Sequence, residues 1–171
     1  MKPDKVFIFN MKHSEKNFED ILYNNIDNEV FPFYYTDKTW KRRQFNIKGY
    51  GICDIITAKR SECYPSGRGH YCSDITISIY EIKKGAIDIN TLAQTLRYAD
   101  GVKKYMYKRG FRDKFWILIN LVGKEVKVKK DHKYIFDLIS SNDLSVKLYT
   151  YKYDFNEISM SEVPEKEYLN V

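Results

Sequence analysis

Apolar residues recur along this chain with two different periods, and these periods divide it into helices and strands. A helical spacing of apolar positions predicts amphipathic helices over 13–26 and 88–110. A two-residue period, typical of strands, marks 49–59 and 75–84. Residues 114–122 are almost entirely apolar, which indicates a strand covered on both faces.

Capping signals and apolar stripes support both helices. Ser14 or Asn17 can cap the first helix, Asn90 is expected to cap the second, and Gly110 ends the second. The stripes consist of Phe18, Ile21, Leu22 and Ile26 in the first helix and of Leu92, Leu96, Ala99, Val102 and Met106 in the second.

The remaining segments carry weaker signals. Residues 6–11 predict a short strand and 132–141 a short helix, whereas 29–49 contain a loop and a strand and 60–74 a loop or hairpin tip. The last alternating segment, 145–155, is expected to be an edge strand with which a second chain could pair. This order of elements predicts an α/β sandwich around a mixed central β-sheet.

Length and composition indicate one globular domain over residues 1–171. The chain is 43% hydrophobic and 30% charged, and no linker or repeat divides it. Its formal net charge of +6 suits an anionic partner, most simply a nucleic acid. No apolar run is long enough for a secretory signal or a membrane span, so we expect no membrane association and a cytoplasmic location.

Three cysteines suggest reduced thiols in an intracellular protein. Cys63, His70 and Cys72 are close enough in sequence to raise the alternative of a zinc site. Their spacing lacks a fourth nearby ligand and matches no standard structural zinc pattern, so ordinary loop and strand residues explain them better.

In two strands of the predicted sheet, charged residues occupy positions where the alternating pattern would place apolar ones. Three isoleucines of the second alternating strand are followed on the same face by Glu81 and Lys83. On the preceding strand, Ile52, Asp54 and Ile56 are expected to share one face. Pairing of the two strands would then bring Asp54, Glu81 and Lys83 onto one mixed face.

Carboxylates buried beside isoleucine are costly unless a positive charge compensates them. Lys83 could compensate one carboxylate, whereas a divalent cation between Asp54 and Glu81 would compensate both. Oxygen ligands favour Mg²⁺ or Mn²⁺, and such a site suits phosphodiester hydrolysis because the metal activates water and stabilises charge on the phosphate. The alternative for an isolated Glu-x-Lys triplet is a solvated strand end.

Three more residues favour a site over a solvated strand end. Gln94 and Tyr98 lie one helical turn apart and are expected to project from one side of their helix, away from its apolar stripe. Glu19 lies off the centre of the apolar stripe of the first helix. Taken singly, these residues are better explained as a polar helix flank and a solvent-facing acid.

Together these residues resemble the PD-(D/E)XK nuclease superfamily, and its RecB-like branch in particular. The matching stretches are GICDII, IYEIKKG and QTLRY, within a core of about residues 14–122 that a helix–strand extension, 123–160, follows. The resemblance implies a restriction-endonuclease-like three-layer sandwich and a nuclease that depends on Mg²⁺ or Mn²⁺. Two features depart from the family pattern: Cys53 stands where a proline often precedes the aspartate, and the four-cysteine cluster of some members is absent, so no iron–sulfur cluster is predicted.

The resemblance also assigns roles. Lys83 would be the catalytic lysine, and Gln94 and Tyr98 would orient the site or the substrate backbone. The predicted catalytic residues are therefore Asp54, Glu81, Lys83, Gln94 and Tyr98, and the predicted metal ligands are Glu19, Asp54, Glu81 and the Ile82 carbonyl.

Basic residues gather in two regions that could contact DNA, and in the first they interleave with aromatic residues, so that cations can bind phosphates and rings can stack on bases. The alternative for each cluster is solvated surface. The predicted DNA contacts are Trp40, Lys41, Arg42 and Arg43 in the first region and Lys59, Arg60 and Arg68 in the second.

Three functional hypotheses follow. The leading one is a metal-dependent DNA endonuclease or exonuclease acting in recombination, repair, or mobile-element or phage DNA processing, for which a homodimer would suit the cutting of both strands. The second is a non-catalytic nucleic-acid-binding or assembly module on the same fold, because fold alone does not fix function. The third is a transition-metal or redox protein that uses Cys63, His70 and Cys72.

Overall fold

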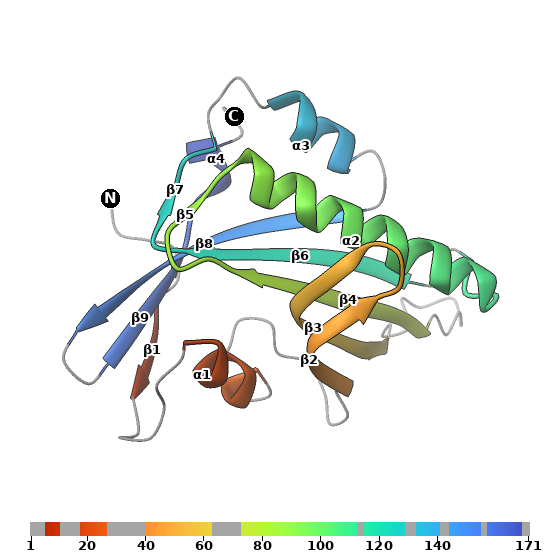
Figure 1. Cartoon of the computed structure of the whole chain (residues 1–171), viewed down its shortest axis with the longest axis horizontal. Helices are drawn as coiled ribbons and strands as arrows, with labels where there is room; N and C mark the ends of the chain where they lie inside the picture. Colours follow the sequence, from red (N-terminus) through yellow and green to blue (C-terminus); the bar gives the residue numbers. More distant parts are fainter. Residues whose placement is uncertain are drawn as a thin grey trace, which may run out of the picture.

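A mixed sheet with helices on both faces forms the body of the protein (Figure 1). The α/β class and the mixed central sheet are therefore confirmed. The computed structural model describes residues 6–10, 18–26, 40–62, 73–112, 115–128, 133–140, 144–154 and 157–168.

The main sheet has seven strands in the order β1-β9-β8-β6-β4-β3-β2. The neighbours β4, β6 and β8 run parallel, and all other neighbouring pairs are antiparallel. A separate short parallel pair joins β5 (Ala86–Ile87) to β7 (Glu125–Val126). The strands of the main sheet are β1 (Val6–Asn10), β2 (Trp40–Ile47), β3 (Gly51–Glu62), β4 (Ser73–Ile82), β6 (Phe115–Gly123), β8 (Leu144–Asp154) and β9 (Glu157–Glu162).

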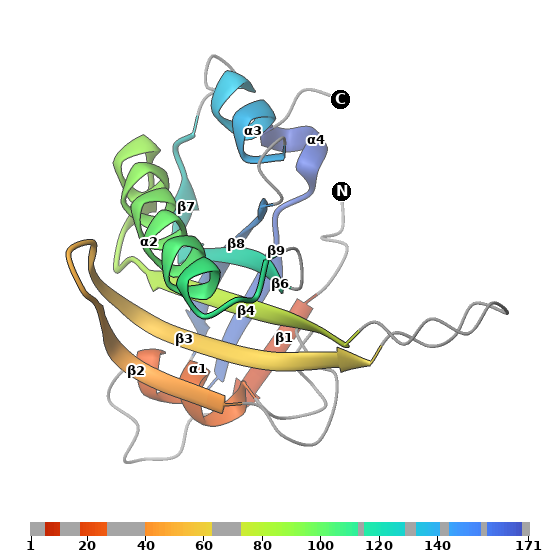
Figure 2. The same cartoon turned by 90° about the vertical axis from the view of Figure 1, so that its right-hand side faces the viewer.

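Helices lie on opposite faces of this sheet, as Figures 1 and 2 show together. On one face, α1 (Phe18–Asn25) packs into a core with residues of β3, β4, β6, β8 and β9. On the other face, α2 (Ile89–Lys108), α3 (Lys133–Ser140) and α4 (Glu165–Tyr168) contribute to a second core. No helix in the described part of the chain is long and apolar enough to cross a membrane.

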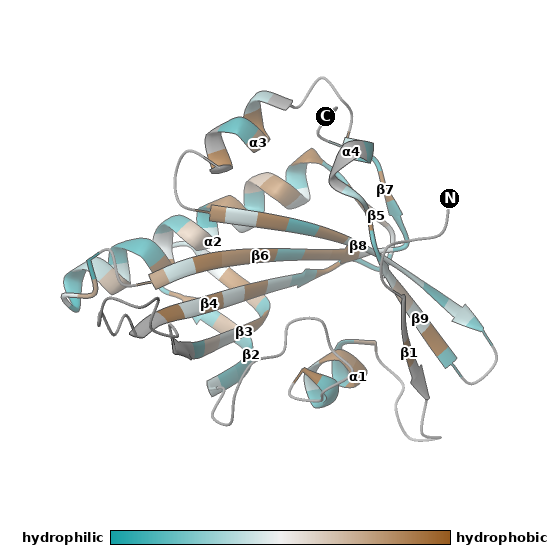
Figure 3. Ribbon diagram, turned by 180° about the vertical axis from the view of Figure 1, so that it is seen from behind, coloured by the Kyte–Doolittle hydropathy of each residue, from teal (hydrophilic) through white to brown (hydrophobic). Residues whose placement is uncertain are grey.

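The predicted apolar stripes supply these cores. All four stripe residues of α1 are buried, and so are four of the five on α2, Leu96 being partly buried. Full burial of one such side chain contributes about 1.5–3 kcal/mol. Hydrophobic residues also concentrate along β4 and β6 (Figure 3), which fits the mainly apolar pattern of 114–122, although Asn120 within it is a buried polar residue.

Two local predictions are wrong. Asp88 caps α2 instead of Asn90: its carboxylate accepts a hydrogen bond from the Thr91 amide at 2.8 Å, and this bond lowers the pKa of Asp88. The predicted edge strand 145–155 corresponds to β8, which lies between β6 and β9. The strand β9, which the sequence pattern does not predict, pairs antiparallel with β8 and covers the edge expected to be free.

Gly101 allows α2 to lie close to the β2–β3 hairpin. A Cβ atom there would come within 2.6 Å of both Ile47 Cγ2 and Tyr50 Cγ. We expect Gly101→Ala to destabilise the protein by about 1–3 kcal/mol in urea unfolding, because overpacking outweighs the better helix propensity of alanine. Gly85→Ala is the matched control, since a Cβ atom there meets nothing within 4 Å. An equal stability of both variants would contradict this packing argument.

Candidate active site

Strands β3 and β4 part at the position of the predicted site. Their pairing runs from Glu62↔Ser73 to Ile55↔Tyr80 and stops there. Beyond this point β3 continues to pair with β2, and β4 continues to pair with β6 as far as Ile82↔Val122. The separation creates a fork, which we define as the space between Asp54 on β3 and residues 81–82 on β4.

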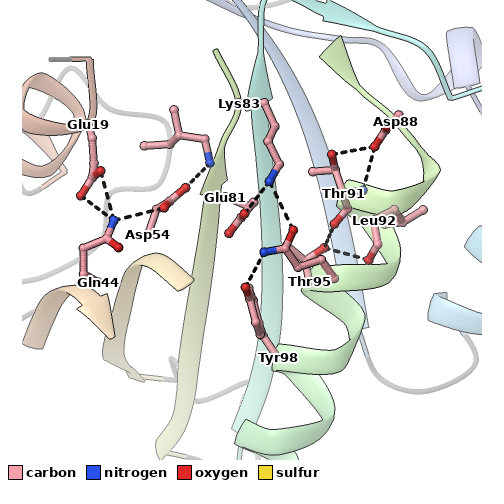
Figure 4. A network of polar contacts seen from close by, with 12 residues as sticks. Glu19, Gln44, Asp54, Glu81, Lys83, Asp88, Thr91, Leu92, Thr95 and Tyr98 are labelled. Carbon is pink, nitrogen blue, oxygen red and sulfur yellow. Dashed lines mark hydrogen bonds and ion pairs between the residues drawn. The ribbon is translucent and has the colours of Figure 1, made fainter. Parts of the chain in front are cut away.

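Asp54 lies in the fork and replaces the missing strand partner of β4. Its Oδ2 accepts a hydrogen bond from the Ile82 backbone N–H at 2.7 Å, and its Oδ1 accepts one from Gln44 Nε2 at 3.2 Å (Figure 4). In an extended strand, the N–H and C=O of one residue point to the same edge. The Ile82 carbonyl therefore faces the fork as well.

The expected common face of Ile52, Asp54 and Ile56 is wrong. Ile56 belongs to the core under α2, whereas its neighbour Ile55 belongs to the core under α1. The alternation breaks because β3 is irregular at Asp54, which has no register partner in β2 or β4. Asp54 consequently enters the fork from the side of α1, and the predicted single mixed face does not form.

Glu81 continues the isoleucine face of β4 toward α2, as its spacing predicts. It is only 4% exposed, and its Oε1 accepts a hydrogen bond from Lys83 Nζ at 2.8 Å. Its Oε2 is buried and has no hydrogen-bond partner among the described residues. One oxygen of this buried carboxylate is thus satisfied and the other is not, which is costly for a charged group.

Lys83 connects the strand to α2. Its ammonium group also donates to Gln94 Oε1 at 3.3 Å, and Gln94 Nε2 donates to the Tyr98 hydroxyl at 2.5 Å. Its backbone is held at both ends, since Lys83 N donates to Val122 O and the Tyr151 hydroxyl donates to Lys83 O. Glu81, Lys83, Gln94 and Tyr98 therefore form one continuous polar chain (Figure 4).

Tyr98 does not project away from the apolar stripe of α2. It is 2% exposed and belongs to the core under this helix, so that expectation is wrong. A glycine makes room for its ring: Gly51 has φ +124°, and a Cβ atom there would lie 2.7 Å from Tyr98 Cε1. The buried ring fixes the hydroxyl, and the hydroxyl in turn holds Gln94 beside Lys83.

Glu19 reaches the fork from α1. Its side chain is 15% exposed, its Oε1 accepts from Arg43 Nε at 3.2 Å, and both carboxylate oxygens lie 3.2 Å from Gln44 Nε2. Arg43 also pairs with Asp20 of the same helix. Glu19 is therefore held toward β2 and is not a freely solvated acid.

Burial, together with repulsion from a neighbouring carboxylate, raises the pKa values of both fork carboxyls. For Asp54 the main cause is burial, which outweighs the hydrogen bonds from Ile82 and Gln44. For Glu81 it is again burial, with a further rise caused by the charge of Asp54, and the Lys83 contact offsets only part of the rise. The negative charges in the fork are thus incompletely compensated.

This imbalance predicts how stability depends on pH when divalent cations are chelated. A raised folded-state pKa means that the native protein retains protons which the unfolded chain has lost above about pH 4. Wild-type stability should therefore fall, relative to that of Glu81→Gln, as the pH rises from about 4 through the raised pKa values. Urea unfolding of both proteins in EDTA across this range measures the difference, and a constant difference would contradict the prediction.

The donor set of the fork suits a hard divalent cation. Asp54, Glu81, Glu19 and the Ile82 carbonyl offer only oxygen, and the unpartnered Glu81 Oε2 is a buried oxygen that a cation would satisfy. Within the described ranges, no group of three or more His, Cys, Asp or Glu side chains is already arranged to hold a metal ion. Binding would therefore require the carboxylates to move closer together.

The first predicted DNA-contact region divides into two parts. Trp40 and Arg42 are exposed, and the guanidinium lies over the indole at 5.4 Å from the ring centroid. Lys41 and Arg43 instead hold α1 against β2: Lys41 Nζ donates to Tyr23 O at 2.9 Å, and Arg43 pairs with Glu19 and Asp20. Arg43 therefore positions Glu19 directly, and Lys41 fixes the helix that carries it.

The second region is described only at Lys59, a half-buried residue of β3 whose pKa is lowered by burial. Arg68 and the proposed zinc residues Cys63, His70 and Cys72 lie outside the described residues, as does the side chain of Arg60. Elsewhere, an apolar cavity of about 670 Å³ lies between β2–β4 and the C-terminal half of α2, and Lys48, Lys104 and Lys108 are among its lining residues.

Gln44 is the site residue that sequence reasoning missed. It contacts Glu19, 25 positions away, and Asp54, 10 positions away, so no local pattern marks it. Its φ of +44° is the structural signal, because residues other than glycine seldom adopt this conformation outside turns and functional sites. Comparisons of the chain with protein-family models, curated proteins and solved structures found no match, so a functional proposal rests on the geometry of the fork.

Proposed function

We propose that the protein is a Mg²⁺-dependent nuclease that hydrolyses DNA phosphodiester bonds, with a restriction-endonuclease-like arrangement of its core. The observation that carries this proposal is the pair of desolvated carboxyl groups at the fork: Asp54 accepts a hydrogen bond from the Ile82 N–H on the side of α1, and Glu81 pairs with Lys83 and through it with Gln94 on the side of α2. A structural ion pair would explain Glu81 and Lys83 alone. It would not explain a second desolvated carboxylate in the fork or a buried carboxylate oxygen without a partner.

Each fork residue has a distinct task in this proposal. Asp54, Glu81, the Ile82 carbonyl and Glu19 hold the cation, and a bound magnesium ion supplies water activation and charge neutralisation at the phosphate. Lys83 places a positive charge beside the scissile phosphate, where negative charge increases in the transition state. Gln94, fixed by Tyr98, restrains the lysine ammonium on the α2 side.

The charge distribution supports a polynucleotide substrate. The net charge of +6 favours binding of a polyanion, and it coexists with incompletely compensated acids in the fork. Arg42 and Trp40 provide an exposed cation and ring on β2, the strand that also carries Gln44. Such a pair suits a phosphate with an adjacent unstacked base.

A cleavage panel tests the proposal. The purified protein is incubated with supercoiled, linear, single-stranded and branched DNA, each with Mg²⁺ or with EDTA. Cutting of at least one substrate only in the presence of Mg²⁺ would support a nuclease. Binding without metal-dependent cutting of any substrate would refute it and favour a non-catalytic nucleic-acid-binding module.

A further inference from the structure

The side-chain amide of Gln44 lies between two acids of the fork. Its Nε2 is 3.2 Å from Glu19 Oε1, 3.2 Å from Glu19 Oε2 and 3.2 Å from Asp54 Oδ1. A single neutral NH₂ group thus faces three carboxylate oxygens from α1 and β3 (Figure 4). This is the position in which a cation would bridge the same two residues.

The backbone of β2 directs Gln44 into this position. The β2–β3 register pairs Arg43 with Ile55 and Phe45 with Cys53 but omits the intervening pair of Gln44 and Asp54. Gln44 adopts φ +44° there, which is an irregular conformation for a strand residue. Because an irregularity of this kind redirects a side chain, the glutamine points toward the acids and not along the regular face of the strand.

The amide compensates these acids poorly. It is neutral, and its contacts of 3.2 Å are at the long end of the hydrogen-bond range. Elsewhere in the fork, Glu81 Oε2 is buried without a partner among the described residues. This second observation independently indicates that the fork is built for an additional positive group. A divalent cation held by these residues would supply the positive charge that the amide lacks.

We propose that Gln44 is a positioning residue that competes with the divalent cation. Its amide bridges Glu19 and Asp54 by hydrogen bonds, and cation binding displaces it. This inference rests on the proposed metal site and deepens it. The side chain is exposed, so the displaced amide can hydrogen-bond with solvent. Gln44 thereby weakens cation affinity and occupies the position between the two acids until a cation enters.

The inference predicts opposite effects of one substitution on two measurements. In Gln44→Ala, Mg²⁺ and Mn²⁺ should bind about 3–10-fold more tightly in titration calorimetry, because no amide must be displaced. The melting temperature in EDTA should fall by a few degrees, because Glu19 and Asp54 then repel each other without a shared donor. Asn46→Ala, an exposed amide two residues further along β2, is the matched control and should change neither quantity.

Three other results would each overturn the inference. Weaker cation binding by Gln44→Ala would show that the side chain is a ligand and would overturn the inference, as would unchanged affinity. If Gln44→Ala shows weaker or unchanged binding while the wild-type protein binds Mg²⁺ and cuts DNA, the proposed function stands and only the role of Gln44 is refuted. If wild type binds neither Mg²⁺ nor Mn²⁺, the metal site itself is refuted and the inference fails with it.

Discussion

Replacement of Lys83 by alanine is expected to reduce Mg²⁺-dependent DNA cleavage by at least about 100-fold, the usual loss when one charge-stabilising donor is removed. Lys83 Nζ lies 2.8 Å from Glu81 Oε1 and 3.3 Å from Gln94 Oε1, so its positive charge is held next to the buried carboxylate. Initial cleavage rates at saturating DNA measure the loss, and circular dichroism establishes that the fold persists. Gln94→Ala should lose less activity, because Glu81 still holds the lysine.

The neighbouring lysine provides the control for this experiment. Lys84 is exposed and carries the same charge, so Lys84→Ala should cleave at nearly the wild-type rate. If Lys83→Ala retained the wild-type rate in protein free of contaminating nuclease, the catalytic assignment would be wrong. If both variants lost activity equally, the lysines would contribute to general attraction of DNA and not to the chemical step.

Magnesium is expected to raise the melting temperature, and Asp54→Asn should remove most of that rise. At a concentration 100 times its Kd, a ligand stabilises the native state by about 2.7 kcal/mol. In a chain of 171 residues this corresponds to roughly 5–10 °C. Asparagine keeps an acceptor for the Ile82 amide but lacks the charge that attracts the cation, so the variant should melt in EDTA at or above the wild-type temperature.

An acid remote from the fork separates specific binding from general ionic effects. Asp137 is exposed on α3, so Asp137→Asn should retain the full magnesium shift. A shift of equal size in wild type, Asp54→Asn and Asp137→Asn would show that magnesium acts elsewhere on the protein. No shift in wild type at any concentration would remove the basis for a metal-dependent reaction.

Much of the local structure could be predicted because it depends on short-range periodicity. The stripe from Phe18 to Ile26 is buried, and β4 carries Ile77, Ile79 and Glu81 on one face. The same spacing placed Gln94 and Tyr98 one turn apart, and their side chains are in contact. Each of these features repeats within one element, so neighbouring residues are enough to specify it.

The predictions failed where one residue departs from its local pattern. Asp54 interrupts the alternation of β3, so Cys53 before it and Ile55 after it, which a regular strand would place on one face, lie in the cores on opposite faces of the sheet. Tyr98 is buried because Gly51, on a different element, leaves space for its ring. In both cases a contact between elements outweighs the periodicity within one.

The sequence by itself determined the two main helices, the strands near 49–59, 75–84 and 114–122, the apolar stripes of the helices, and that two acids and a lysine occur near strand ends. Only the tertiary structure decided that β3 and β4 separate between Asp54 and Glu81, that β8 is internal, and that Gln44 lies between Glu19 and Asp54. The physical reason is that periodicity reports which side chains avoid water, whereas strand pairing and the meeting of charges depend on segments distant in the chain.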